Sequence, residues 1–141
     1  MSWTFKGIKE QIRNREIEGV SGTPLGLAGG MTLMILCASD ANPRYKMYGE
    51  AYRRQAASLR RAKASEEVQK AFFAKEFAKM FVASWDVRDE ETDEPIPCTK
   101  EAVEAFLLES DDAIPAILEV YGDTINFRGQ RIEVVVAAAK N

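Results

Sequence analysis

The sequence predicts a mainly α fold, a single compact helical domain over residues 1–141 with a small β-hairpin near residues 22–39. Three observations lead to this prediction. A chain of 141 residues with 46% apolar content can bury roughly two-thirds of its unfolded surface around one core. From Tyr45 onward, apolar residues recur at intervals of three and four, which is the period of a helix. Capping residues, Ser65 and Thr99, directly precede two of these apolar runs.

The first forty residues predict a short helix followed by a turn-rich apolar segment. Phe5, Ile8 and Ile12 recur at helical spacing, so a short amphipathic helix is expected there. The following stretch, "GVSGTPLGLAGGMTLMILCASDANP", places five glycines around an apolar run. Met31–Ala38 is expected to be a buried strand that pairs with "SGTPLGLAG" in a hairpin, and a short buried helix is the alternative that its length leaves open.

Two longer helices are expected next. The first has Tyr45, Tyr48, Tyr52, Ala56 and Leu59 on its inner side and basic residues on its other faces. The second begins after Ser65 and continues to Trp85, because apolar residues recur throughout this stretch. Its broad apolar face indicates central burial and carries the densest aromatic group of the chain, Phe72, Phe73, Phe77, Phe81 and Trp85.

A corner and two further helices complete the prediction. Prolines 95 and 97 stop the helix from continuing, and Thr99 starts a new one. Ser110 or Asp111 is expected to cap the last helix. The predicted inner face of that helix is Ile114, Ile117, Leu118, Tyr121 and Ile125. Within residues 130–141, valines favour a strand and alanines favour a helix, and we predict a helix.

The residue types predict neither an enzyme nor a metal or cofactor site. The sequence has no histidine, which excludes the commonest general base and most zinc sites. Cys98, just before a helix start, is a candidate nucleophile, but a small structural residue is the favoured interpretation there and for Cys37. The glycine-rich segment lacks the phosphate-loop pattern. The acidic run from Asp86 to Glu94 lacks the glycine of a calcium loop and is interpreted as a solvated turn.

A basic helix provides one alternative function. Arginines and a lysine in the 53–63 region suggest a small cytoplasmic regulator that grips a nucleic-acid backbone. The net charge of −3 does not attract the whole protein to polyanions, so nucleic-acid binding is the less favoured prediction. The most apolar stretch, Leu25–Ala38, is too short for a membrane helix, and the charged amino terminus lacks the core of a signal peptide. We therefore expect no membrane segment.

The stretch "VASWDVRDEETDEPIPCTKEAVEAFLLE" resembles the tail assembly chaperones of long-tailed bacteriophages and prophages. Many members of this family have a tryptophan-ended helix, an acidic turn, a proline-containing corner and a helix that ends near an acidic pair. A later helix closes in "NF", which here is Asn126 and Phe127. The opening "FKGIKEQIRNRE" and the stretch "DANPRYK" are compatible with the family. Cys98 departs from it, since an apolar residue is expected there, and this makes thiol chemistry less favoured.

The resemblance implies a non-enzymatic chaperone of the host cytoplasm that is absent from the mature virion. Such a protein binds the tape measure protein, keeps it soluble and leaves when tail tube protein polymerises. The implied partner-binding residues are Phe72, Phe73, Phe77, Phe81 and Trp85, and self-association is expected. In the family, ribosomal slippage often yields a longer form, through which tail tube protein is contacted. Ala139, Lys140 and Asn141 can be encoded by a slippery string, which reading the gene tests.

Overall fold

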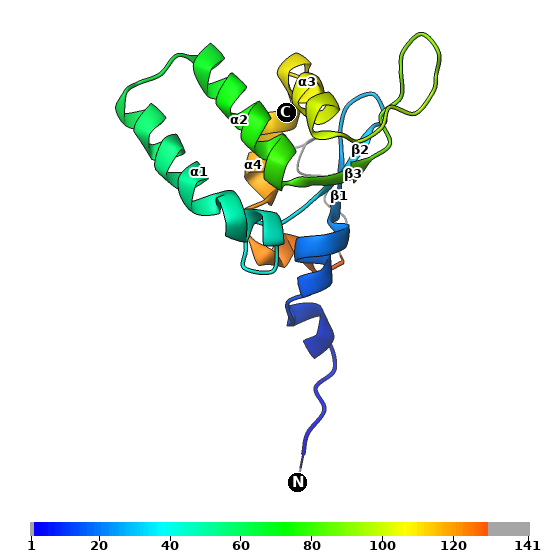
Figure 1. The fold of residues 1–141 in the computed structure, drawn as a ribbon. Helices are drawn as coiled ribbons and strands as arrows, with labels where there is room; N and C mark the ends of the chain where they lie inside the picture. Colours follow the sequence, from blue (N-terminus) through cyan, green and yellow to red (C-terminus); the bar gives the residue numbers. More distant parts are fainter. Residues whose placement is uncertain (1, 130–141) are drawn as a thin grey trace.

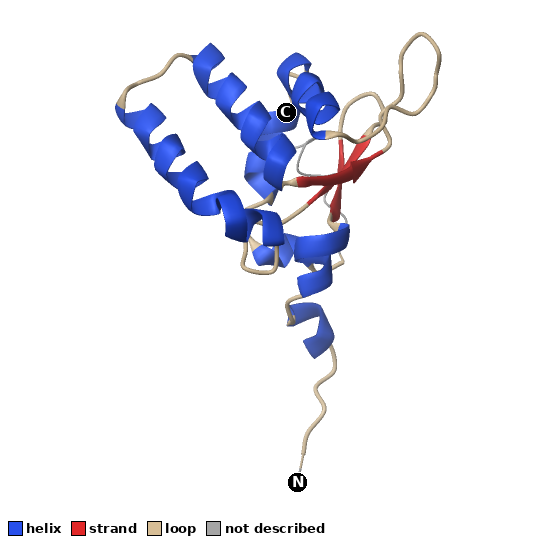
Figure 2. Cartoon of the chain, viewed as in Figure 1, coloured by secondary structure: helices blue, strands red, loops and turns tan. Residues whose placement is uncertain are grey.

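The computed structural model describes residues 2–129, so the helix expected within residues 130–141 lies outside the described residues. About half of the chain is helical, and three short strands form one antiparallel sheet (Figures 1 and 2). The mainly α prediction therefore holds in a coarser form, a helix-rich mixed fold. The elements in chain order are η1 (Ile8–Gln11), η2 (Ile17–Ser21), β1 (Thr23–Gly26), β2 (Thr32–Ile35), α1 (Pro43–Arg61), α2 (Glu66–Met80), β3 (Val82–Trp85), α3 (Lys100–Glu109), α4 (Ala113–Val120) and η3 (Thr124–Phe127).

The predicted hairpin is confirmed, and its alternative, a short buried helix, is wrong. Strands β1 and β2 pair antiparallel, with Thr23 opposite Ile35 and Gly26 opposite Thr32. The turn between them contains Gly29 and Gly30, both with positive φ, a conformation that glycine adopts without steric cost. The glycine-rich composition of this segment therefore serves a tight turn.

The sheet has a third strand that was not predicted. Helix α2 ends at Met80, and Val82–Trp85 form β3, which pairs antiparallel with β2. The prediction that the aromatic helix continues to Trp85 is wrong. Apolar spacing cannot separate the buried end of a helix from a short buried strand, and here the backbone of β2 supplies the partner that decides the outcome. Trp85 lies opposite Leu33 in this pairing.

The helix starts largely follow the predicted capping residues. The Ser65 hydroxyl accepts a hydrogen bond from the Val68 amide, and the Thr99 hydroxyl accepts one from the Ala102 amide. Ahead of α4, the Ser110 hydroxyl accepts from the Ala113 amide, at 3.1 Å. These bonds satisfy backbone donors that lack partners in the first turn of a helix.

The inner face predicted for the last helix is only partly correct. Ile114 and Ile117 are buried, but Leu118 and Ile125 are exposed. The helix is shorter than its apolar pattern suggests, since α4 ends at Val120 and the chain then turns into η3. Its buried side is completed by small residues and a valine, Ala113, Ala116 and Val120.

The amino-terminal amphipathic helix was predicted wrongly. Only one 3₁₀ turn forms there, η1, and the preceding Gly7 has a φ of 84°, which interrupts a right-handed helix. The apolar side chains of Phe5, Ile8 and Ile12 remain exposed. Figure 1 shows this amino-terminal segment projecting from the helices and the sheet. We call residues 3–12 the arm.

The buried side chain of Asn42 joins three segments of the chain. Its amide nitrogen donates to the carbonyl oxygens of Cys37 and Met80, both at 3.0 Å, and its oxygen accepts from the Arg44 amide at 3.1 Å. Asn42 is fully buried. It therefore both caps α1 and fixes the end of α2 next to the segment that follows β2.

A buried carboxylate anchors the base of the arm. Glu18, in η2, is fully buried. Its oxygens accept hydrogen bonds from Arg13 Nη2 at 2.6 Å, Arg13 Nε at 3.0 Å and the Ser39 hydroxyl at 2.7 Å. Beside it, a Cβ added at Gly19 would lie 1.8 Å from the Ala41 carbonyl oxygen. The backbone of η2 thus lies so close to the backbone at Ala41 that only glycine fits at position 19.

This anchor predicts a loss of stability in acid. The hydrogen-bonded Arg13 guanidinium holds the pKa of Glu18 below its ordinary value, and Arg13 and Arg15 do the same for Asp40. A carboxylate whose pKa is depressed on folding stabilises the protein above its unfolded pKa, about 4.3 for glutamate, and loses this contribution as the pH falls through its folded pKa. The free energy of unfolding should therefore fall below about pH 4.

Urea denaturation between pH 6 and pH 3 measures this effect, with Glu18→Gln as the comparison. The substitution removes the ionisable group while retaining the size of the side chain. The Glu18→Gln protein should be less stable at pH 6 and should show a shallower decline in acid. An equal decline in both proteins would show that other carboxylates cause it.

Candidate partner-binding surface

Four of the five aromatic residues proposed for partner binding form one continuous chain of ring contacts. The ring centroids of Phe72 and Phe73, of Phe73 and Phe77, and of Phe77 and Phe81 are each 5.4 Å apart. Their exposure differs, however. Phe77 and Phe81 have no exposed surface, whereas Phe72 and Phe73 are half-buried. Only Phe72 and Phe73 therefore offer surface area to a partner in this conformation.

One tyrosine of α1 and one directly after α4 pack against this aromatic chain. The Tyr52 ring stacks on Phe72 with an interplanar angle of 3°, and Tyr121 meets Phe81 edge-on at 4.7 Å. The two tyrosine hydroxyls hydrogen-bond to each other at 2.9 Å. Burial, together with the hydrogen bond between the two hydroxyls, raises the pKa of Tyr52 well above its ordinary range. This cluster joins α1, α2 and the end of α4, and its chief role is to hold the core together.

Trp85 lies apart from the other four predicted residues. Its indole nitrogen donates to the Ile96 carbonyl oxygen at 2.7 Å, and its ring contacts Phe106 of α3 edge-on at 5.5 Å. The tryptophan thus fixes the corner after the acidic loop against α3. The structure brings Phe72, Phe73, Phe77 and Phe81 together and places Trp85 in a different contact group.

Four large exposed apolar side chains lie elsewhere, close together on the arm. Trp3 is 74% exposed, Phe5 64%, Ile12 57% and Ile8 40%. Single exposed apolar residues are ordinary on protein surfaces, but four in ten consecutive positions form a concentrated apolar segment. The sequence contained the signal, the helical spacing of three of these residues, but that spacing suggested packing against the core. The sequence analysis therefore did not single out these residues as candidate binding surface.

The basic end of α1 is exposed as well. Arg54, Arg60, Arg61 and Lys63 are all exposed. Arg53 is held differently, because its guanidinium donates to the Tyr45 hydroxyl at 2.6 Å and lies 5.4 Å from the centre of that ring. The acidic residues that start α2, Glu66 and Glu67, are exposed on the adjoining turn, so both signs of charge are present at this corner.

The cysteines show no sign of thiolate activation. Burial raises the pKa of Cys37 to about 11. Cys98 is exposed, and partial desolvation raises its pKa despite the nearby Arg44 charge.

The acidic stretch forms a loop. Asp89 Oδ1 accepts from the amides of Glu91 and Thr92, so this carboxylate organises a turn.

Within residues 2–129, no cluster of acidic or cysteine side chains is arranged to hold a metal ion. In the same range, no helix has the length and apolar content needed to cross a bilayer. No model of a known protein family matches the chain, and neither does a curated protein or a solved structure.

Proposed function

We propose that this protein is a tail assembly chaperone of a long-tailed bacteriophage or prophage, which binds the tape measure protein and keeps it soluble. The observation that carries the proposal is the projecting arm with four exposed apolar side chains, Trp3, Phe5, Ile8 and Ile12. A chaperone of this kind needs apolar surface that a helical client can cover. The resemblance of the Trp85 corner to the family supplies the identity of the client.

In this proposal the arm binds the tape measure protein, and the helices and sheet position the arm. Burying a large apolar side chain contributes about 1.5–3 kcal/mol, so two aromatic residues on the arm can contribute substantially to binding. The half-buried Phe72 and Phe73 would extend the contact, while Phe77 and Phe81 would act only through the core. Self-association, contact with tail tube protein through a frameshift-extended form and release before the virion matures belong to the same proposal.

Serine substitutions on the arm test its role. In a protein carrying both Trp3→Ser and Phe5→Ser, the concentration needed to keep half of a co-purified tape measure segment soluble should rise roughly tenfold or more. The stability of the protein itself should change by no more than about 0.5 kcal/mol, because both side chains are exposed. Sedimentation of the client and urea denaturation of the chaperone measure the two effects.

Met47→Ser provides a matched control, because Met47 is 73% exposed but lies on α1 rather than on the arm. This substitution should leave client solubility unchanged. If the tape measure segment precipitates equally with and without the unsubstituted protein, the chaperone proposal is wrong. Gene order gives an independent check, since a tail tube gene upstream and a very long tape measure gene downstream are expected.

The exposed arginines at the end of α1 keep the nucleic-acid regulator as a second candidate. Phosphate contacts through Arg54, Arg60 and Arg61 would release counterions, so affinity for DNA or RNA should fall steeply with salt. Absence of binding at low salt would eliminate this candidate. The −3 net charge and the neighbouring glutamates make it the weaker of the two.

A further inference from the structure

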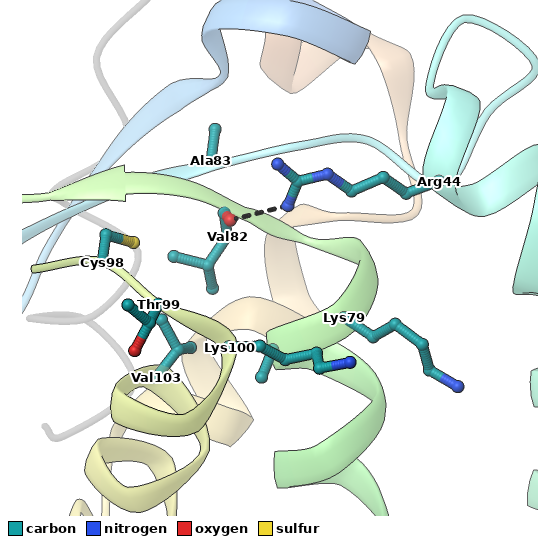
Figure 3. A pocket seen from close by; sticks show the side chains of 9 residues that line it. Arg44, Lys79, Val82, Ala83, Cys98, Thr99, Lys100 and Val103 are labelled. Atoms are coloured by element: carbon teal, nitrogen blue, oxygen red, sulfur yellow. Dashed lines mark hydrogen bonds between the residues drawn. The ribbon is translucent and has the colours of Figure 1, made fainter.

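A pocket of about 250 Å³ opens where α1, α2, β3 and α3 meet (Figure 3). Its apolar wall comes from Val82 and Ala83 of β3 and from Val103 of α3. The third strand creates this site, because β3 carries the chain from the end of α2 past the start of α1. The proposed chaperone function does not use this pocket.

Three cations from three different helices line the pocket. Arg44 comes from the start of α1, Lys79 from the end of α2 and Lys100 from the start of α3. Among the described residues that line it there is no carboxylate. Figure 3 shows the Arg44 and Lys100 side chains extending beside the pocket from α1 on one side and α3 on the other. A concentration of positive charge around a partly apolar space favours an anionic ligand.

The charges of these cations are balanced to different extents. Lys79 Nζ lies 3.3 Å from Glu76 Oε1 and 4.6 Å from the centre of the Tyr48 ring, so its charge is partly compensated. Arg44 Nη1 donates to the Val82 carbonyl oxygen at 3.1 Å, which holds the guanidinium at the wall without neutralising it. Over residues 2–129, neither Arg44 nor Lys100 has a carboxylate within ion-pair distance.

We propose that this pocket binds a small oxyanion, a carboxylate or a phosphate group, between Arg44 and Lys100. The apolar wall allows the oxyanion to be carried on an apolar group. Arginine offers a planar pair of donors that matches either oxyanion, and lysine adds a mobile point charge. The positive end of the α3 dipole adds to the same field. This site is independent of the chaperone proposal, since none of its residues lies on the arm.

Cys98 provides a reporter within the site. Its side chain lines the pocket and is exposed, whereas Cys37, the only other cysteine in the sequence, is buried. A neutral alkylating reagent should therefore modify Cys98 first, and an occupant of the pocket should slow that reaction. Because the reagent carries no charge, the cations of the pocket do not attract it. A bound oxyanion should slow the reaction in two ways, by blocking access to Cys98 and by lowering its thiolate fraction, so the rate reports occupancy of the pocket.

The experiment measures Cys98 alkylation by iodoacetamide in the full-length protein at constant ionic strength. Three probes are compared: inorganic phosphate, N-acetyl-leucine and N-acetyl-leucine amide. The two oxyanions should slow alkylation and shift the backbone amide resonances of residues 99–103, while the neutral amide should do neither. Protection by phosphate alone assigns the site to phosphate groups, and stronger protection by N-acetyl-leucine assigns it to carboxylates on an apolar body.

Charge variants show whether the effect belongs to the pocket. Lys100→Gln should raise the half-protecting concentration at least about threefold, and Lys100→Arg should restore it. Lys75→Gln removes an exposed charge of α2 outside the pocket and should have no effect. Equal protection by the neutral amide, no protection by either oxyanion, or equal weakening in the Lys75→Gln protein would each overturn the proposal.

Discussion

Asn42→Asp should lower the free energy of unfolding by about 2–4 kcal/mol at neutral pH. The substitution keeps the size of the side chain and the acceptor that caps α1, but it removes both hydrogen bonds donated to Cys37 and Met80. A carboxylate oxygen would then face two carbonyl oxygens at a fully buried position. Losing two hydrogen bonds and leaving buried acceptors unpaired accounts for a loss of this size.

Urea denaturation measures the effect, and Asn126→Asp is the matched control. Asn126 makes one hydrogen bond of the same kind, from its amide nitrogen to the Val120 carbonyl at 3.0 Å, but it is only partly buried. Its replacement should cost no more than about 1 kcal/mol. The deficit of the Asn42→Asp protein should also be smaller at pH 5 than at pH 8, because a protonated carboxyl can donate one bond. Equal losses for the two substitutions would contradict the central role of Asn42.

Phe77→Ala should lower the free energy of unfolding by about 3–5 kcal/mol. Phe77 is fully buried, and its ring contacts those of Tyr52, Phe73, Phe81 and Tyr121. Truncation leaves a cavity at the junction of α1, α2 and the end of α4, where residues from three elements limit collapse. Thermal and urea denaturation measure the loss.

Phe72→Ala is the comparison, because Phe72 lies on the same helix and in the same chain of rings but is only half-buried. The Phe72→Ala substitution should lower the free energy of unfolding by at most about 2 kcal/mol. Phe77→Leu, which retains most of the volume, should leave the solubility of the tape measure segment unchanged. A direct effect of Phe77→Leu on client binding, without a change in stability, would show that the aromatic chain opens toward the client.

The features that sequence reasoning predicted are local ones. Ser65 and Thr99 act on amides three positions later, and the β1–β2 hairpin joins neighbouring strands through a glycine turn. Strand β3 was missed because its partner β2 is separated from it by both long helices. Apolar spacing marks Phe72 and Phe77 alike. Both rings contact Tyr52, but Phe77 also contacts Tyr121 and is inaccessible, whereas Phe72 is half-buried.

The two candidate sites also differ in whether they depend on local sequence or on residues far apart in the chain. The arm was visible as apolar spacing, yet spacing does not tell whether a surface exists to cover it. The oxyanion pocket was invisible, because Arg44, Lys79 and Lys100 come from three helices and meet only through the placement of β3. Arg44 stands in the "DANPRYK" stretch, and no local pattern links it to Lys100.

The order of strands in the sheet also has a consequence for folding kinetics. Strands β2 and β3 are neighbours in space, but the whole α1–α2 helical pair separates them along the chain. Closing so long a loop directly carries an entropic cost, whereas contacts within the helical pair form between nearby residues. We therefore expect the helical pair to form early and β3 to join the sheet late. Until then β2 has an unpaired edge, so newly made chains would be most prone to aggregation during that interval.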